Sequence, residues 1–184
     1  GSTSWVYSYT EGDDLDEDTL LAPPSHLYSV TKLASEYYCR SYQELYGLEP
    51  TILRYGIPCG PRARAGAVVP SFVNRALRGE TITIAGDGSQ FRQFVYVEDL
   101  AEGNVLAIKP VAKGKTYNLD GAEKITIRQI AETIQRIVGD VEIQYTDARP
   151  GDYSGKECLS LRAKTELGWE PRTPFAEGLR RYIE

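Results

Sequence analysis

Tyr28-Ser29-Val30-Thr31-Lys32 opens a tyrosine-rich stretch of the chain that runs to Gly47. A tyrosine and a lysine four positions apart lie on one face of a helix, one turn from each other. The spacing therefore places an ammonium group beside a phenol, and an adjacent cation favours the ionised phenol, which can act as a base. Taken alone, the pair is a weak signal, and two ordinary residues on a helix surface are the favoured interpretation.

The residues around this pair predict a helix over 28–46, ended by Gly47 and capped at its start by Ser25. Apolar and aromatic side chains recur along it at spacings of three and four: Leu33, Tyr37, Tyr38, Tyr42, Leu45 and Tyr46. Such a stripe indicates that the helix packs against the protein core.

Composition and charge limit the possible functions. The 184 residues are 41% hydrophobic and 26% charged, as in soluble globular proteins. The net charge of −5 argues against a nucleic-acid surface, and neither a membrane span nor a signal peptide is recognisable. Cys39, Cys59 and Cys158 are widely spaced and odd in number, which suits reduced thiols in a cytoplasmic protein. With His26 as the single histidine, we expect no metal site.

The rest of the chain alternates strand-like and helix-like segments. An acidic stretch over 11–18 is interpreted as a solvated loop, and Asp87-Gly88 predicts a hairpin between two strand-like runs. The segment over 85–90 lacks the third glycine of a dinucleotide-binding fingerprint. Asp99 and Thr126 are expected to cap helices. The predicted strands cover 3–7, 51–55, 91–97, 116–119 and 142–146, and the further helices 68–78, 99–108, 127–138, 161–167 and 174–183.

Several short motifs follow one another along the chain at characteristic intervals. They are Thr3 to Tyr7, Leu53-Arg54-Tyr55, Gly60-Pro61-Arg62, Phe91 to Asp99, Arg149-Pro150-Gly151-Asp152 and Leu167-Gly168-Trp169. In this order the chain resembles the extended short-chain dehydrogenase/reductase family, specifically its NAD-dependent nucleotide-sugar epimerases and dehydratases. The resemblance implies an α/β fold that corresponds to the C-terminal part of a family member. Residues 1–60 would be the last part of a doubly wound Rossmann-type parallel sheet. Residues 61–184 would form the smaller substrate-binding domain, with about 99–119 returning to the Rossmann part.

The resemblance also implies roles for individual residues. Thr3, Tyr28 and Lys32 would be catalytic, with Thr3 hydrogen-bonded to the reacting sugar hydroxyl. Tyr28, Lys32 and Tyr55 would contact NAD or NADP. Arg92 and Arg149 would hold the diphosphate of a sugar nucleotide in one cleft, because guanidinium groups bind phosphate in a bidentate manner. The implied substrate-binding positions are Ser4, Ile57, Ala67, Val68, Thr83, Ala85, Arg92, Arg149 and Asp152.

Three departures from the family pattern qualify these roles. Dehydratases carry Asp-Glu after the residue that corresponds to Thr3, whereas this chain has Ser4 and Trp5, which disfavours dehydration. Ile57 replaces an asparagine that contacts the sugar nucleotide, and Ala85 replaces an aromatic residue that stacks on the base. A 4-epimerase is therefore expected. The alternatives are a nucleotide-sugar reductase and a non-catalytic sugar-nucleotide-binding or dimerising module.

The family's glycine-rich pyrophosphate loop does not stand before Thr3. The resemblance thus implies that NAD or NADP belongs to the complete enzyme, and that this chain alone is inactive and binds no cofactor. We expect a nucleotide-sugar as the small-molecule partner. We also expect self-association through the helix over 28–46 and the open edge of the sheet.

Overall fold

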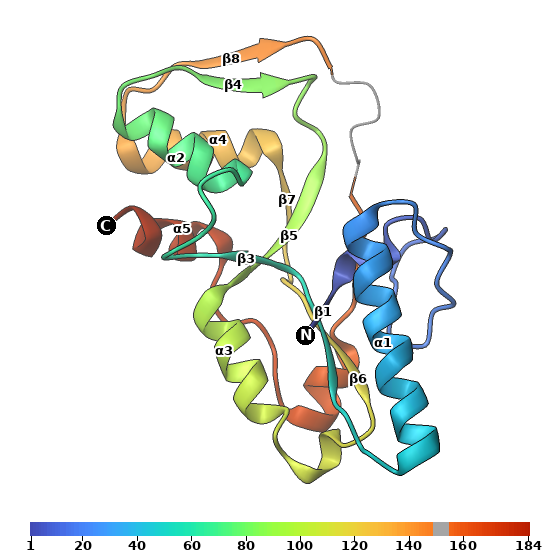
Figure 1. Ribbon diagram of the computed structural model, residues 1–184. Coiled ribbons are helices and arrows are strands. Elements are labelled where there is room, and N and C mark those ends of the chain that lie inside the picture. Colours follow the sequence, from blue (N-terminus) through green and yellow to red (C-terminus); the bar gives the residue numbers. More distant parts are fainter. Residues whose placement is uncertain (149–154) are drawn as a thin grey trace.

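The computed structural model describes residues 1–148 and 155–184, arranged as two lobes (Figure 1). Its longer helices are α1 (Leu27–Tyr46), α2 (Val68–Leu77), α3 (Val97–Leu106), α4 (Ile127–Val138) and α5 (Phe175–Ile183). Short turns of other helical types are η1 (Ser4–Tyr7), η2 (Pro110–Ala112) and η3 (Ala163–Leu167). The strands are β1 (Ser2–Thr3), β2 (Ile52–Tyr55), β3 (Ile57–Cys59), β4 (Ile82–Ala85), β5 (Phe91–Tyr96), β6 (Thr116–Leu119), β7 (Lys124–Thr126) and β8 (Ile143–Thr146). No helix in these ranges is long and apolar enough to cross a membrane.

The lobe that contains α1 and α3 is built on a parallel sheet. Its strand order is β1-β2-β6, with Thr3 opposite Tyr55 and Tyr55 opposite Leu119. Apolar side chains of β2 and β6 are buried, as expected for a parallel sheet that is covered on its faces. Trp169 is 1% exposed in this core, and its indole N–H donates to the carbonyl of Asp99 at 2.7 Å. The predicted α/β fold with a Rossmann-type parallel sheet is confirmed.

The other lobe combines α2, α4 and α5 with two small sheets. β3 pairs in parallel with β5, which pairs antiparallel with β7, and β4 pairs in parallel with β8. Ile82 and Ile84 of β4 and Ile130 and Ile134 of α4 are at most 1% exposed. The predicted cap of α4 is confirmed by a capping box. The Thr126 hydroxyl accepts from the backbone N–H of Gln129, and the Gln129 side chain accepts from the backbone N–H of Thr126.

Two local predictions about strands are wrong. Asp87-Gly88 does not form a hairpin, because β4 pairs with the distant β8 and β5 pairs with β3 and β7. The turn instead lies against the start of α4, where the backbone N–H of Arg128 donates to the carbonyl of Gly88 at 3.1 Å. The strand predicted over 3–7 ends at Thr3, whose hydroxyl accepts from the N–H of Trp5 and starts the 3-10 turn η1.

The helix prediction for α1 is confirmed in its extent and only partly in its packing. Gly47 ends the helix in the left-handed conformation, with φ of 67°. His26 occupies the N-cap position without a side-chain bond, so the predicted Ser25 cap is wrong. Leu33 packs against the buried cluster of Val6, Tyr7, Leu15 and Cys158, whereas the rest of the apolar stripe faces solvent, so core packing holds only for the first part of the stripe. The exposed fractions are 60% for Tyr37, 71% for Tyr38, 51% for Tyr42, 69% for Leu45 and 67% for Tyr46.

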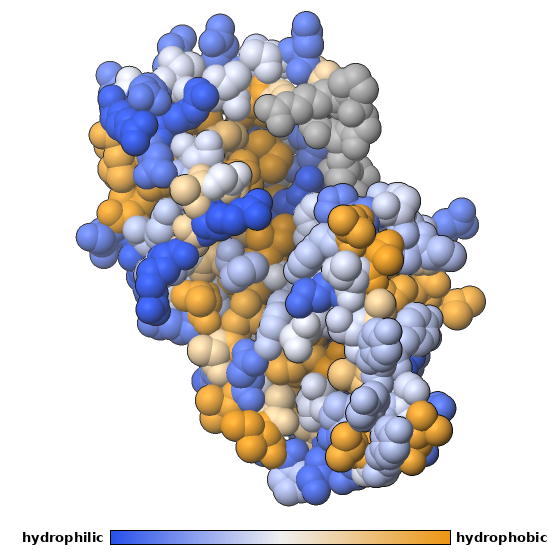
Figure 2. Space-filling model, viewed as in Figure 1, coloured by the Kyte–Doolittle hydropathy of each residue, from blue (hydrophilic) through white to orange (hydrophobic). Residues whose placement is uncertain are grey.

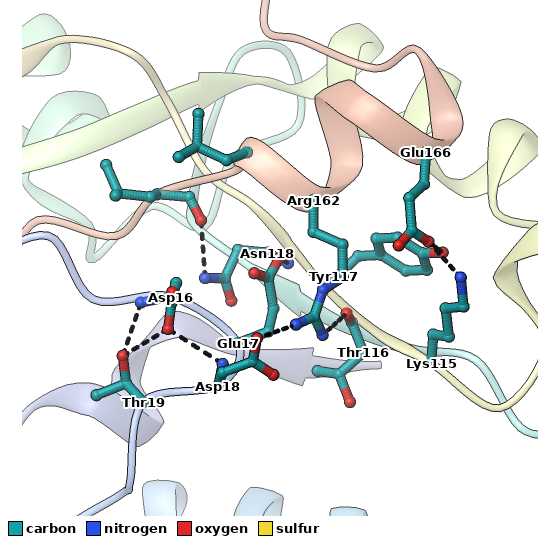
Figure 3. A network of polar contacts seen from close by, with 12 residues as sticks. Asp16, Glu17, Asp18, Thr19, Lys115, Thr116, Tyr117, Asn118, Arg162 and Glu166 are labelled. Carbon is teal, nitrogen blue, oxygen red and sulfur yellow. Dashed lines mark hydrogen bonds and ion pairs between the residues drawn. The ribbon is translucent and has the colours of Figure 1, made fainter.

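Two predicted roles of acidic residues are also corrected. Asp99 lies inside α3, and its carboxylate accepts from the N–H groups of Arg172 and Thr173 at 3.1 and 2.9 Å, so it ties the C-terminal segment to α3. The acidic stretch is not simply solvated, because it docks on β6 and η3 (Figure 3). The carboxylate of Glu17 accepts from the N–H of Asn118 at 2.7 Å, and Asp18 pairs with Arg162 at 2.6 Å.

Candidate active site

The carboxyl ends of the three parallel strands define one edge of the sheet. Thr3 ends β1, Tyr55 ends β2, and Asp120 directly follows β6. The register pairs Thr3 with Tyr55 and Tyr55 with Leu119, so these strand ends lie side by side. In open α/β sheets, ligands bind outside this edge.

The helix that carries the tyrosine and the lysine, α1, packs beside this region. α1 packs against β1 and η1, and Tyr28 in its first turn is 46% exposed. The Lys32 ammonium donates to the carbonyl of Gly1 at 3.0 Å. The ring of Tyr55, from β2, also lies against Gly1. The structure therefore brings Lys32 and Tyr55, both predicted cofactor contacts, to the same residue beside Thr3.

A buried polar network fixes α1 relative to β1 and β2. Glu36 of α1 is 2% exposed and accepts from Nε and Nη2 of Arg54 at 3.0 and 2.7 Å. The hydroxyl of Ser2 donates to the same carboxylate at 2.5 Å. Arg54 also donates to the hydroxyl of Tyr7 at 2.6 Å. This network was not predicted from the sequence, because it joins α1 to residues of strands that are distant in the chain.

The side chain of Tyr7 extends the network to the acidic stretch. Its hydroxyl lies 2.8 Å from the carbonyl of Asp16 and 3.0 Å from the side-chain oxygen of Asn118. Burial raises the pKa of Tyr7 to about 12, against the opposing effect of Arg54, so the phenol keeps its proton near neutral pH. Thr3 thus lies at the end of β1, which is held to α1 by the bond between Ser2 and Glu36 and to β2 by strand pairing.

Two adjoining pockets collect most of the predicted substrate residues. A pocket of about 570 Å³ is lined by Ile57, Ala67, Val68 and Arg92, together with Trp5. A second, of about 350 Å³, is lined by Thr83 and Ala85 and again by Val68 and Arg92. Hydrophobic surface is visible in the hollow between the two lobes (Figure 2). The ring of Trp5 lies 6.1 Å from that of His26, which connects the first pocket to the start of α1.

Arg92 is common to both pockets and projects from β5. It is partly buried, and its Nη1 donates to the carbonyl of Phe91 at 2.6 Å. Arg149 and Asp152 lie outside the described residues. The prediction that Arg92 and Arg149 share one cleft therefore stays a prediction.

Asp120 was missed by the sequence analysis. Together with Ser4, Ile57 and Arg92 it lines a cavity of about 20 Å³ next to the larger pocket. Burial raises the pKa of Asp120 to about 7, although hydrogen bonds from the Gly121 N–H and the Ser4 side chain favour its ionised form. Its position in the sequence was the signal that could have identified it. A carboxylate that directly follows a buried parallel strand lies at the ligand-binding edge of the sheet.

Comparison with known proteins gives one family. A model described as the NAD dependent epimerase/dehydratase family matches residues 1–120. A UDP-glucuronate 4-epimerase of Thermodesulfobacterium geofontis is 33% identical over 187 residues, which cover 99% of this chain and 56% of that protein.

Solved structures agree with this result. UDP-glucose 4-epimerase of Thermotoga maritima, solved with UDP-glucose, is 32% identical with a TM-score of 0.90, and the match covers 99% of this chain and 60% of that one. UDP-glucuronic acid 4-epimerase of Bacillus cereus, in complex with UDP-glucuronic acid and NAD, is 31% identical with a TM-score of 0.90, over 99% and 58%. This chain thus spans 56% to 60% of the length of these three proteins. On its sequence and its fold, the chain belongs to the NAD-dependent epimerase/dehydratase family.

Proposed function

We propose that this chain carries the sugar-nucleotide site and the proton-transfer residues of an NAD-dependent nucleotide-sugar 4-epimerase. The observation that carries the proposal is the gathering of predicted substrate residues around Arg92, in two pockets next to the carboxyl edge of the β1-β2-β6 sheet. The relatives named above, which are 4-epimerases of UDP-sugars, support the choice of reaction. In this proposal, residues 1–60 and about 99–119 belong to the NAD-binding part and the rest of 61–184 forms the substrate domain.

The proton-transfer residues have separate tasks. Tyr28 takes the proton of the reacting sugar hydroxyl and later returns it, which is general acid–base work. Thr3 orients that hydroxyl by a hydrogen bond from the end of β1. Lys32 places a positive charge one helical turn from the phenol. The partial exposure of Tyr28 leaves its hydroxyl accessible to a substrate.

The residues at the sheet edge fit the ribose end of NAD. The ammonium of Lys32 uses one of its three donors on the carbonyl of Gly1 and is partly exposed, so two donors remain for ribose hydroxyls. Tyr28 and Tyr55 would contact the same part of the cofactor. NAD, when bound, supplies the hydride acceptor that the side chains of this chain lack.

The remaining parts of the proposal concern the surface and the location. The exposed tyrosines and leucine of α1 (Tyr37, Tyr38, Tyr42, Leu45 and Tyr46) form an apolar face that we assign to pairing with a second copy of the chain. The free thiols of Cys39, Cys59 and Cys158 support a cytoplasmic location.

The test is a single-atom change in Tyr28. In the NAD-loaded enzyme that carries this sequence, Tyr28→Phe should lower the rate of 4-epimerisation by about 10² to 10⁴, because it removes the proton-transferring hydroxyl. Tyr37→Phe makes the same change on the exposed face of the same helix and should leave the rate unchanged. Equal rates for Tyr28→Phe and the parent would refute the proposed role. Binding of sugar nucleotides without any turnover by the parent would favour a non-catalytic module.

A further inference from the structure

Asp120 combines deep burial with a position beside the predicted sugar end of the site. Its side chain is 4% exposed and lines the cavity of about 20 Å³ that Ser4, Ile57 and Arg92 also line. Trp5, Ile57 and Arg92 line both this cavity and the 570 Å³ pocket. The cavity that Asp120 lines therefore shares a wall with the larger pocket.

The backbone around Asp120 leaves room for this carboxyl group. A Cβ atom added to Gly56 would meet Oδ1 of Asp120 at 2.0 Å, so the glycine that links β2 to β3 is required where the carboxyl lies. The N–H of Gly56 donates to the carbonyl of Leu119 at 2.9 Å, which holds the two segments together. The close fit fixes the carboxyl in one place at the edge of the sheet.

The groups that hold the carboxyl are neutral. Its Oδ1 accepts from the N–H of Gly121 at 2.8 Å, and the Ser4 side chain provides a second hydrogen bond. Of the two cationic residues that line the cavity, Lys156 directs its ammonium to the carbonyl of Gly12 at 3.2 Å, and Arg92 directs Nη1 to the carbonyl of Phe91. Burial raises the pKa of this carboxyl, and among the described residues the only groups that oppose the shift are the Gly121 N–H and the Ser4 side chain. A buried carboxylate without a cation is costly, and such groups gather at functional sites.

The size of the cavity decides what can enter it. A volume of about 20 Å³ holds one water-sized polar group, since a cavity needs roughly 10 to 15 Å³ for a water molecule. One sugar hydroxyl fits this space and can donate to the carboxylate. A carboxylate substituent is larger, and it would bring a second negative charge next to the first.

We propose that Asp120 is a specificity-determining residue of the sugar subsite, which accepts a hydrogen bond from one neutral sugar hydroxyl and rejects a sugar acid at that position. This inference rests on the proposed sugar-nucleotide site. It assigns the substrate class as a nucleoside diphosphate hexose with an uncharged substituent facing Asp120.

The test compares two ligands on three proteins by calorimetric titration. The titrations are run above the raised pKa of Asp120, where its carboxyl is ionised. There the parent should bind UDP-glucose more tightly than UDP-glucuronic acid by at least about tenfold, because like charges in a buried site repel. Asp120→Asn keeps the shape of the side chain and removes the charge, so it should bring the ratio of the two affinities close to one. Glu123→Gln removes one negative charge from the exposed neighbouring turn and should leave the ratio of the parent unchanged.

The possible failures are distinguishable. If the parent binds neither ligand, the proposed function is wrong and this inference falls with it. If the parent binds both ligands equally, or if Asp120→Asn keeps the preference of the parent, the assignment of Asp120 is wrong while the sugar-nucleotide site stands. The comparison within the parent does not depend on whether a variant folds.

Discussion

Glu36→Gln should be among the most damaging single changes in α1. Glu36 and Arg54 are 2% and 1% exposed, and two hydrogen bonds join them at 3.0 and 2.7 Å. The substitution keeps the size of the side chain but leaves the Arg54 guanidinium buried without its counter-charge. Breaking a buried ion pair from one side costs about 3 to 5 kcal/mol. Because the hydroxyl of Ser2 donates to the same carboxylate, the position of β1 and of Thr3 should also loosen.

Urea denaturation followed by circular dichroism measures this loss. With a slope of about 2 kcal/mol per molar urea, a loss of about 4 kcal/mol lowers the midpoint by about 2 M. Glu49→Gln is the matched control, because its ion pair with Lys113 joins side chains that are 56% and 59% exposed. Such a pair contributes about 0 to 1 kcal/mol. A loss below about 1 kcal/mol for Glu36→Gln would refute the reasoning about the buried network.

Three further predictions concern other parts of the chain. Burial raises the pKa of Asp120 from 3.8 to about 7, so the folded state holds this proton more tightly than the unfolded state does. At 1.36 kcal/mol per pH unit, the free energy of unfolding should fall by up to about 4 kcal/mol between pH 4 and 7. Asp120→Asn should remove that component, and an identical pH profile for parent and variant in urea titrations would contradict it. Asp99→Ala should lower stability by about 1 to 3 kcal/mol in thermal unfolding, because two N–H groups lose their acceptor; an unchanged midpoint would show that water replaces it. Leu45→Glu should weaken self-association in sedimentation experiments, and a strictly monomeric parent would refute pairing through α1.

Local signals in the sequence predicted most elements of the fold. Gly47 ends α1 and Thr126 starts α4, because both act through bonds within one turn of the helix. The hairpin predicted at Asp87-Gly88 is wrong for the same reason, since that signal is local too. Instead, β4 finds its partner in β8, about sixty residues away. The spacing of the α1 stripe was read correctly, but periodicity cannot tell a buried face from one that is left open.

The sequence predicted those residues of the candidate site that belong to a recognisable motif. Ile57, Val68, Thr83 and Arg92 were expected at the substrate and line adjoining pockets. Asp120 was not expected, because its environment depends on the pairing of β6 with β2 and on the space beside Gly56. The Glu36–Arg54 pair joins a helix to a strand, and such a contact between distant segments has no signature in either segment alone.

The central claim is that the pockets around Arg92 bind a sugar nucleotide. Calorimetric titration of the chain with UDP-glucose tests this directly, with Arg92→Leu as the variant. Arg78→Leu serves as the control, because the Arg78 side chain is 71% exposed on the surface. A charge-assisted hydrogen bond contributes about 1.5 to 3 kcal/mol, so Arg92→Leu should weaken binding by about tenfold to a hundredfold while Arg78→Leu leaves it unchanged. The absence of saturable binding to the parent, or equal affinities for the parent and Arg92→Leu, would contradict the claim.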